Sequence, residues 1–126
     1  MYKRQLLPHG GGLGPVLTES WALNLPPRLV VGEQRRSIVR VDHPGVVVTA
    51  VKAADDGSGD VVVRLHEAFG GRARTTLTSS AHVGAVVVCD LLERPTGAEQ
   101  GVSGSGVDVE LRPFEVRTLR LRRSRH

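Results

Sequence analysis

The sequence is poor in aromatic residues and has a single cysteine. Only 3% of its 126 residues are Phe, Trp or Tyr, so a buried core must be built mainly from Val, Leu and Ala. Valine is β-branched and favours strands, which makes a β fold the first expectation. The lone Cys89 excludes an internal disulfide and a cysteine-based zinc site. We predict that Cys89, which lies in a valine-rich run, is a small buried residue.

Long apolar runs are also missing. There is no stretch of about eighteen apolar residues, so we expect no membrane-spanning segment and no membrane partner. The first eight residues contain no hydrophobic segment long enough for a secretory signal. Together with the single cysteine, this favours a reducing, cytoplasmic location.

Lysine is rare, and the net charge of +4 comes almost entirely from arginine. The excess gathers near the C-terminal end, at Arg117, Arg120, Arg122, Arg123 and Arg125, with His126 beyond. Nucleic-acid binders usually interleave basic residues with exposed aromatic residues or place them on a groove-reading helix, and neither pattern occurs here. The sequence therefore predicts a solvated tail and no nucleic-acid partner; a phosphate-binding patch is the alternative.

Valine-rich segments separated by turn residues are the main positive feature. A short helix is expected to begin at Pro15 and to end at residues 24–27. The expected extended segments are residues 2–7, 28–31, 38–41, 46–52, 60–69, 72–78, 84–91 and 107–111, and a closing strand after Pro113. Residues 96–106 read as a Gly/Ser-rich loop. The predicted fold class is all-β, an antiparallel β-sandwich with one short helix near the N-terminus.

The closing strand has an uneven pattern. Phe114, Val116 and Thr118 would share one face of it, and Leu121 falls out of phase with them. This predicts a bulge, or burial of both faces, near the end of the strand.

No motif points to chemistry in this chain, and we predict no catalytic, substrate-binding or metal-binding residue. Asp108 and Glu110 lie roughly 7 Å apart if they share a strand face, a spacing that a glycosidase could use. They alternate with Val107, Val109 and Leu111, so a solvated outer face is the favoured interpretation.

Other candidate residues have equally plain interpretations. Asp55 and Asp56 read as turn formers, and the histidines His9, His43, His66 and His82 are scattered without metal-ligand spacing. The glycine-rich loop at 9–15 lacks the spacing of a phosphate loop. Trp21 is interpreted as a packing residue, with a sugar-stacking platform as the alternative.

Four blocks of sequence stand out along the chain: LLPH at 6–9 with WALNLP at 21–26; VVTAVKAAD at 47–55 with VVRLHEA at 62–68; DLLER at 90–94; and PFEVRTL at 113–119. In this order they resemble family 38 glycoside hydrolases, the retaining α-mannosidases, and the resemblance extends over most of the chain. The resemblance implies a C-terminal fragment of a long enzyme. Residues 1–32 would be the tail of a preceding β domain with a short helix and linker, and residues 33–126 the C-terminal β-sandwich domain.

In such enzymes the zinc ligands and the nucleophilic aspartate lie in the N-terminal catalytic portion, so the resemblance places zinc outside this segment. It implies a non-catalytic domain that packs on the catalytic portion and on the preceding β domain, and meets mannose-containing glycans only through the parent enzyme. The first strand, severed from its sheet, could add to the sandwich, pair with another copy of the chain, or be disordered. The rival hypothesis is a stand-alone carbohydrate-binding sandwich.

Overall fold

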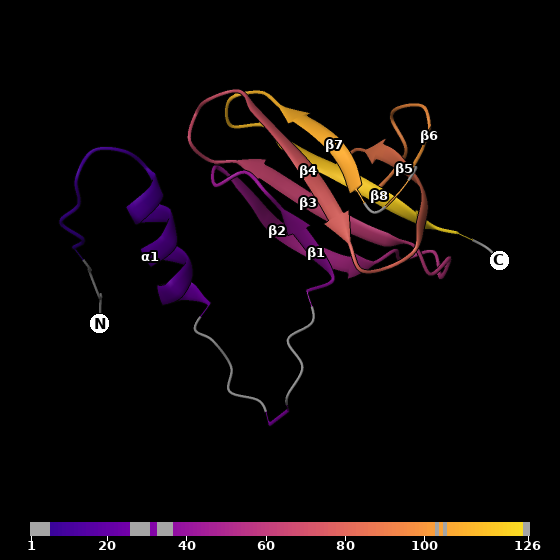
Figure 1. Cartoon of the computed structure of the whole chain (residues 1–126), viewed down its shortest axis with the longest axis horizontal. Coiled ribbons are helices and arrows are strands. Elements are labelled where there is room, and N and C mark those ends of the chain that lie inside the picture. The colour runs from indigo at the N-terminus through magenta and orange to yellow at the C-terminus, as the bar shows by residue number, and fades with distance from the viewer. Residues whose placement is uncertain (1–5, 26–30, 33–36, 103, 105, 125–126) are drawn as a thin grey trace. The chain divides into compact units, whose positions relative to one another are not determined.

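The computed structural model describes residues 6–25, 31–32, 37–102, 104 and 106–124. The chain divides into two compact units, residues 1–34 and residues 35–126. The first contains one helix, and the second contains all the strands of the described part (Figure 1). Of the described residues, none lies in a helix long and apolar enough to cross a membrane.

The helix of the first unit, α1 (Gly14–Asn24), begins where the sequence predicts. Pro15 occupies its first turn, where a missing N–H costs no hydrogen bond. It ends at Leu25, whose N–H still donates to the carbonyl of Trp21. No helix residue is buried, and Trp21 is 37% exposed. Of the strand expected at 2–7, Leu6 and Leu7 lie in irregular structure and residues 1–5 lie outside the described residues, as do residues 28–30 of the next extended segment.

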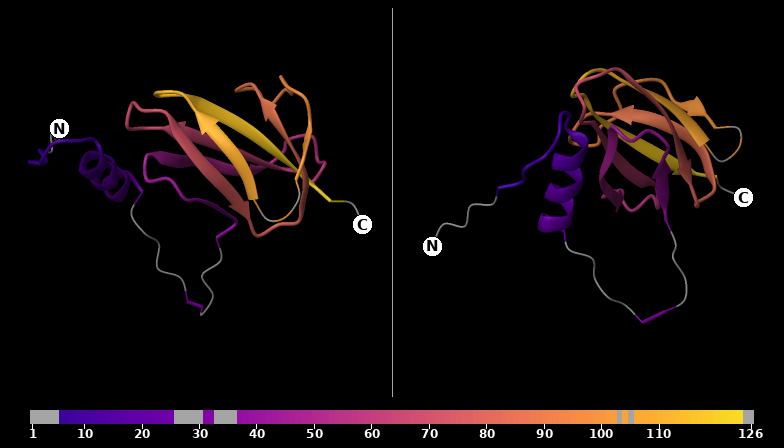
Figure 2. Two further views of the ribbon diagram at one scale, coloured as in Figure 1. Left: turned by 45° about the horizontal axis from the view of Figure 1, so that its top comes forward. Right: turned by 60° about the vertical axis from the view of Figure 1, so that its left-hand side comes forward.

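The second unit is a sandwich of two antiparallel sheets, which Figures 1 and 2 show as stacked layers. One sheet has the order β1-β4-β7 and the other β2-β3-β8-β5-β6. The strands are β1 (Val39–Val41), β2 (Val46–Ala53), β3 (Val61–Glu67), β4 (Ala73–Ser79), β5 (Val83–Cys89), β6 (Gln100–Gly101), β7 (Gly106–Leu111) and β8 (Val116–Arg123). The all-β sandwich class with one short helix is confirmed. Strand β6 lies in the predicted Gly/Ser-rich loop, and no local pattern marks it because it is only two residues long.

The main core lies between the sheets and is aliphatic. It consists of inward-facing residues from both sheets: Val46, Val63, Leu65, Ala73, Leu77, Val86, Val109, Leu111, Leu119 and Leu121. Leu65 and Val63 have no exposed surface at all. Because alternate residues of a strand point to opposite faces, the valine alternation in the sequence predicts this set well.

The outer face of the five-stranded sheet carries a second buried layer. Val62, Val87, Cys89 and Thr118 are each at most 6% exposed, and none of them belongs to the main core. Strand pairing places them on one face, since Val62 and Val87 both lie opposite Arg120, while Cys89 lies opposite Thr118. The predicted burial of Cys89 is confirmed, and burial raises the pKa of its thiol.

The segment that follows β5 covers this layer. Arg64 Nη2 in β3 donates to the carbonyl of Leu91 at 3.1 Å, and Lys52 Nζ in β2 pairs with Glu93 at 2.7 Å. A chain that leaves β5 and reaches β2 must cross β8 and β3, because these strands lie between them in the sheet. The DLLER block is therefore a strap over the outer face.

The closing strand differs from the prediction. Pro113 and Phe114 lie in a turn, and β8 begins at Val116. Leu119 and Leu121 share the core face, so Leu121 is out of phase with Val116 and Thr118, as predicted. The predicted burial of both faces is confirmed at Thr118 and Leu119, and the nearby register shift lies in the partner strand β5, around Gly84.

The prediction of a solvated basic tail is wrong for most of the residues it covers. Arg117, Arg120, Arg122 and Arg123 belong to β8, which pairs with β3 on one side and β5 on the other. Arg125 and His126 lie outside the described residues. A central strand in which Leu and Arg alternate has the same composition as a solvated tail. The number of arginines alone therefore cannot distinguish the two.

We expect Leu65→Ala to destabilise the sandwich by about 2–5 kcal/mol, because it leaves a cavity in the main core. Leu92→Ala is the matched control, since Leu92 is 71% exposed. Urea unfolding followed by far-UV circular dichroism measures both. Equal midpoints for the two variants would contradict the assignment of the core.

Candidate functional site

The carboxylates that could have formed a glycosidase pair lie on an exposed strand face. Asp108 and Glu110 in β7 are both exposed. Each contacts its cross-strand neighbour in β4: Thr76 Oγ1 donates to Asp108 at 3.0 Å, and Arg74 Nε pairs with Glu110 at 2.7 Å. The predicted solvated face is confirmed, and its contacts are ordinary cross-strand pairs.

The described residues contain no group of three or more His, Cys, Asp or Glu that could hold a metal ion. His43 Nδ1 accepts a hydrogen bond from the backbone N–H of Gly45 at 3.1 Å, inside its own turn. Asp55 and Asp56 lie in the turn between β2 and β3, as predicted.

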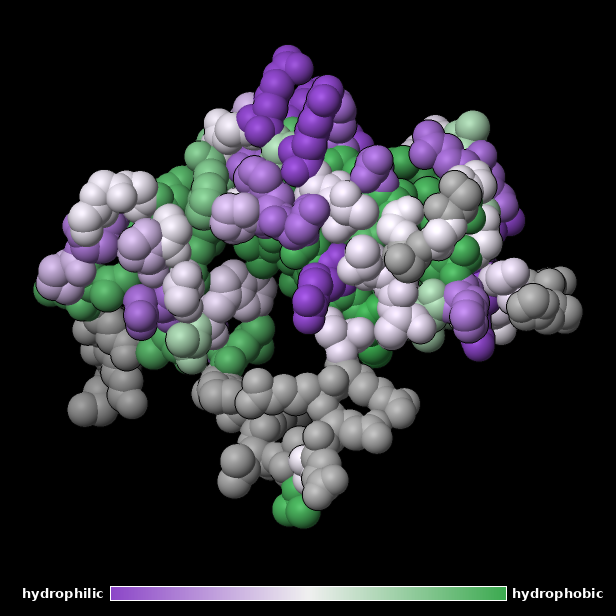
Figure 3. All heavy atoms as spheres, in the orientation of Figure 1, coloured by the Kyte–Doolittle hydropathy of each residue, from purple (hydrophilic) through white to green (hydrophobic). Residues whose placement is uncertain are grey.

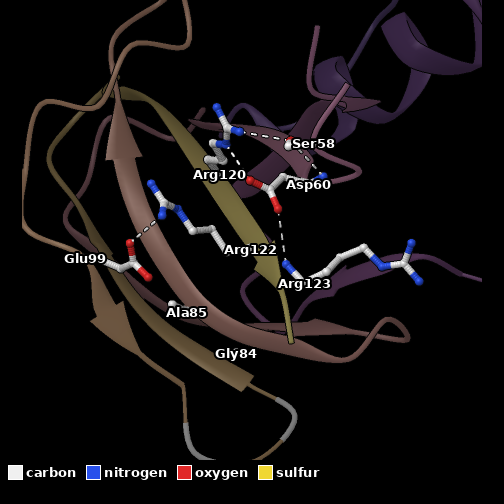
Figure 4. A pocket seen from close by; sticks show the side chains of 8 residues that line it. All are labelled: Ser58, Asp60, Gly84, Ala85, Glu99, Arg120, Arg122 and Arg123. Atoms are coloured by element: carbon white, nitrogen blue, oxygen red, sulfur yellow. Dashed lines mark hydrogen bonds and ion pairs between the residues drawn. The ribbon is translucent and has the colours of Figure 1, made fainter. Parts of the chain in front are cut away.

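A first polar cluster centres on Arg120 in β8 (Figure 4). Its guanidinium binds three partners from the β2–β3 connection: Asp60 at 2.8 Å, Asp56 at 2.6 Å and Ser58 at 3.0 Å. The side chains of Arg120 and Asp60 are only 14% and 11% exposed. Nearby, Arg122 pairs with Glu99 at 2.9 Å, and these groups line a hollow of about 570 Å³.

The electrostatics of this Arg120 cluster are those of a structural pair. Burial alone would raise the pKa of Asp60, but the Arg120 guanidinium and the backbone N–H of Arg123 lower it below its ordinary value. The hydrogen bonds from Arg120 to Asp56 and Asp60 raise the pKa of Arg120. All three groups stay charged at neutral pH, and the cluster fastens the β2–β3 connection to β8.

We expect Arg120→Met to destabilise the sandwich by on the order of 2 kcal/mol, because Asp60 is left half-desolvated without its cation. Arg94→Met is the control: its pair with Asp90 lies at the surface, with the Arg94 side chain 70% exposed, and surface pairs contribute little. Chemical unfolding at pH 7 distinguishes them. A wild-type midpoint for Arg120→Met would show that the cluster is not structural.

A second polar feature is the buried carboxylate of Glu67 at the end of β3, which is 1% exposed. Its Oε1 accepts from the N–H of Phe69, and its Oε2 accepts from the N–H groups of Gly70 and Phe114, all at 2.9 Å. Phe114 is 47 residues away in sequence. One side chain thus joins the β3–β4 turn to the β7–β8 turn.

The turns around Glu67 have glycine at the crowded positions. A Cβ on Gly70 would lie 2.6 Å from the Phe114 ring, and one on Gly45 would lie 2.8 Å from the Phe69 ring. Gly70 also has a φ of +76°, which suits glycine. Ala68 N–H donates to the Gly45 carbonyl at 2.8 Å, so the turn before β2 joins the same end of the sandwich.

Burial alone would raise the pKa of Glu67, but the backbone N–H groups of Phe114, Phe69 and Gly70 together lower it below the ordinary 4.5. The carboxylate is therefore charged at neutral pH without a cationic partner among its hydrogen bonds.

The sequence analysis missed the role of Glu67. A signal was available: Glu67 is in phase with the inward residues Val63 and Leu65, and the turn Phe69–Gly71 follows at once. A charged residue in an inward phase needs partners, and a tight turn offers backbone donors.

We expect Glu67→Gln to lose about 2 kcal/mol of stability at pH 7, because the charge that holds three backbone donors is removed. A lowered folded pKa gives stability that is present above the unfolded value near 4.5 and is lost as pH falls through the folded pKa. The difference in melting temperature between the wild type and the variant should therefore become smaller in acid. Thermal melts from pH 7 to pH 3 measure this; a gap that stays constant or widens in acid would contradict it.

Other carboxylates are also held in the charged form. The resolved shifts among the described carboxyl groups all lower the pKa, at Asp42, Asp56, Asp60, Glu67, Asp90 and Glu115. A general acid in glycoside hydrolysis needs the opposite, a raised pKa that keeps the proton at neutral pH. These six groups therefore do not suit the general-acid role.

Comparison with known proteins agrees with the β-sandwich fold. Residues 45–119 match the model of the glycosyl hydrolases family 38 C-terminal beta sandwich domain. The matched span runs from the turn before β2 into β8 and includes both Glu67 and the Phe114 turn. The chain belongs to this family.

Two curated relatives extend the match to most of the chain. Alpha-mannosidase 2C1 of Homo sapiens is 30% identical over an alignment of 126 residues that covers 92% of this chain. Alpha-mannosidase G of Dictyostelium discoideum is 26% identical over 130 residues, covering 91% of it. The chain spans 12% of the length of each relative, so it corresponds to one domain of a much longer polypeptide.

Proposed function

We propose that this chain is the non-catalytic C-terminal domain of an α-mannosidase and that it packs on the catalytic portion and helps shape its cleft. The parent would hydrolyse terminal α-mannosides with retention, through a covalent intermediate on a carboxylate. The observation that carries the proposal is the family match over residues 45–119. The two relatives, both named α-mannosidases, agree with it.

Zinc, which the resemblance implies, does not fit the described residues, because no three potential ligands come together there. We assign the zinc and the nucleophilic aspartate to the preceding polypeptide. The other expected partners, the preceding β domain and mannose-containing glycans bound by the parent, follow from the same proposal, as does a cytoplasmic location. Pairing of two copies through residues 2–7 stays a prediction, since most of that segment lies outside the described residues.

The arginines of β8 bear on the nucleic-acid alternative. Arg117, Arg120 and Arg122 each bind a carboxylate of this chain, namely Glu115, Asp60 with Asp56, and Glu99. A guanidinium already paired has less to gain from a phosphate, and this favours the absence of a nucleic-acid partner.

The stand-alone carbohydrate-binding module remains the second candidate. The sequence disperses its aromatic residues, but the fold brings Phe69 and Phe114 to the same end of the sandwich, around Glu67. Stacking on a sugar ring is the interaction that such a pair could offer.

The test of the proposed function uses an aryl α-mannoside. We expect the chain alone to release no aryl alcohol, and the polypeptide encoded with it upstream to do so in a zinc-dependent manner. We also expect the two to purify as one assembly when expressed together. Hydrolysis by this chain alone would overturn the proposal. So would hydrolysis by the upstream polypeptide that continues after a chelator has removed its zinc.

A further inference from the structure

Three apolar side chains stand exposed at the end of the sandwich that Glu67 organises. Phe69, Phe114 and Val116 are 40%, 60% and 48% exposed. The backbones of both phenylalanines bind the same carboxylate, and Val116 follows two residues after Phe114 at the start of β8. We call these three residues the aromatic end. Figure 3 shows hydrophilic and hydrophobic residues on one face of the molecule.

Phe114 is held in an unfavourable backbone conformation. Its φ is +57°, a region that aromatic residues rarely adopt. It follows Pro113 in a turn closed by the hydrogen bond from Glu115 N–H to the Arg112 carbonyl, at 3.0 Å. This position of a turn ordinarily carries Gly or Asn when φ is positive. Strain at an exposed aromatic residue is the pattern of a side chain kept for a contact.

The backbone that carries the two rings is held in place, and each ring packs on a glycine. Phe114 covers Gly70 and Phe69 covers Gly45, at contacts too close to admit a Cβ. Glu67 fixes the backbone at Phe69, Gly70 and Phe114 through three hydrogen bonds. A rigid apolar surface loses little conformational entropy on binding, which favours docking.

We propose that the aromatic end docks on the polypeptide that precedes the sandwich in the longer α-mannosidase. This inference rests on the proposed function and names the surface that performs the packing. The chain spans only 12% of either relative, so most of the polypeptide lies outside it.

A sugar is a poorer occupant of this surface. Sugar recognition needs polar groups beside the ring, and both oxygens of Glu67, the carboxylate that binds both phenylalanine backbones, are occupied by backbone N–H groups. Val116 adds aliphatic surface, which has no π face to stack on a pyranose. Apolar protein side chains can pack on both the rings and Val116, and they need no free polar group beside them.

The experiment measures binding of this chain to the upstream polypeptide by isothermal titration calorimetry. Phe69→Ser and Phe114→Asn remove the rings; Asn tolerates a positive φ, so the second variant should keep or raise the melting temperature. Ile38→Ser is the control, since Ile38 is 53% exposed and lies just before β1, at the end of that strand away from the Asp42–Gly45 turn. We expect about tenfold or greater weakening of Kd for each Phe variant and none for the control.

Each other outcome overturns a distinct claim. If the wild-type chain does not bind the upstream polypeptide, the proposed function fails. If it binds and the Phe variants bind equally well, only the aromatic end is wrong as the docking surface. Saturable binding of mannose oligosaccharides, lost in Phe114→Asn, would overturn docking in favour of a sugar site. Dimerisation of the wild type, lost in that variant, would assign the surface to a second copy.

Discussion

The sandwich depends at one end on a single charged group that has no ionic partner among its hydrogen bonds. Glu67 lies in the inward phase of β3, where an unsatisfied carboxylate would be very unfavourable. Three backbone N–H groups from two turns compensate for the lost solvation. Because one donor comes from the β7–β8 turn, the carboxylate can be satisfied only when β3 and β8 are paired. Local turn geometry and long-range strand pairing are thereby coupled.

The central part of the five-stranded sheet is buried on both faces. The main core covers one face, and the strap at residues 90–94 covers part of the other, fastened by Arg64 and Lys52. The Arg120 cluster closes the neighbouring region by holding the β2–β3 connection against β8. Both fastenings use cations on strands to bind groups on loops: Lys52 in β2, Arg64 in β3 and Arg120 in β8.

The blocks of sequence that resemble α-mannosidases are meaningful as structure. VVRLHEA contains β3 and Glu67, PFEVRTL contains the Phe114 turn and the start of β8, and DLLER forms the strap. Two of them meet at Glu67, although 47 residues separate Glu67 from Phe114. Two blocks that lie far apart along the chain therefore contact each other in the fold, and the same end presents Phe69 and Phe114 to the outside.

Strand positions, the antiparallel sandwich class and the burial of Cys89 follow from the sequence alone, because side-chain alternation and turn residues are local properties. The sequence could not reveal which charged residues of β8 are buried, nor that Phe114 leaves the closing strand for a turn. The sequence also does not reveal that Phe69 lies beside the turn that contains Phe114. Those features depend on which strands pair and in what register, and only the tertiary structure decides this, since the partners lie tens of residues apart.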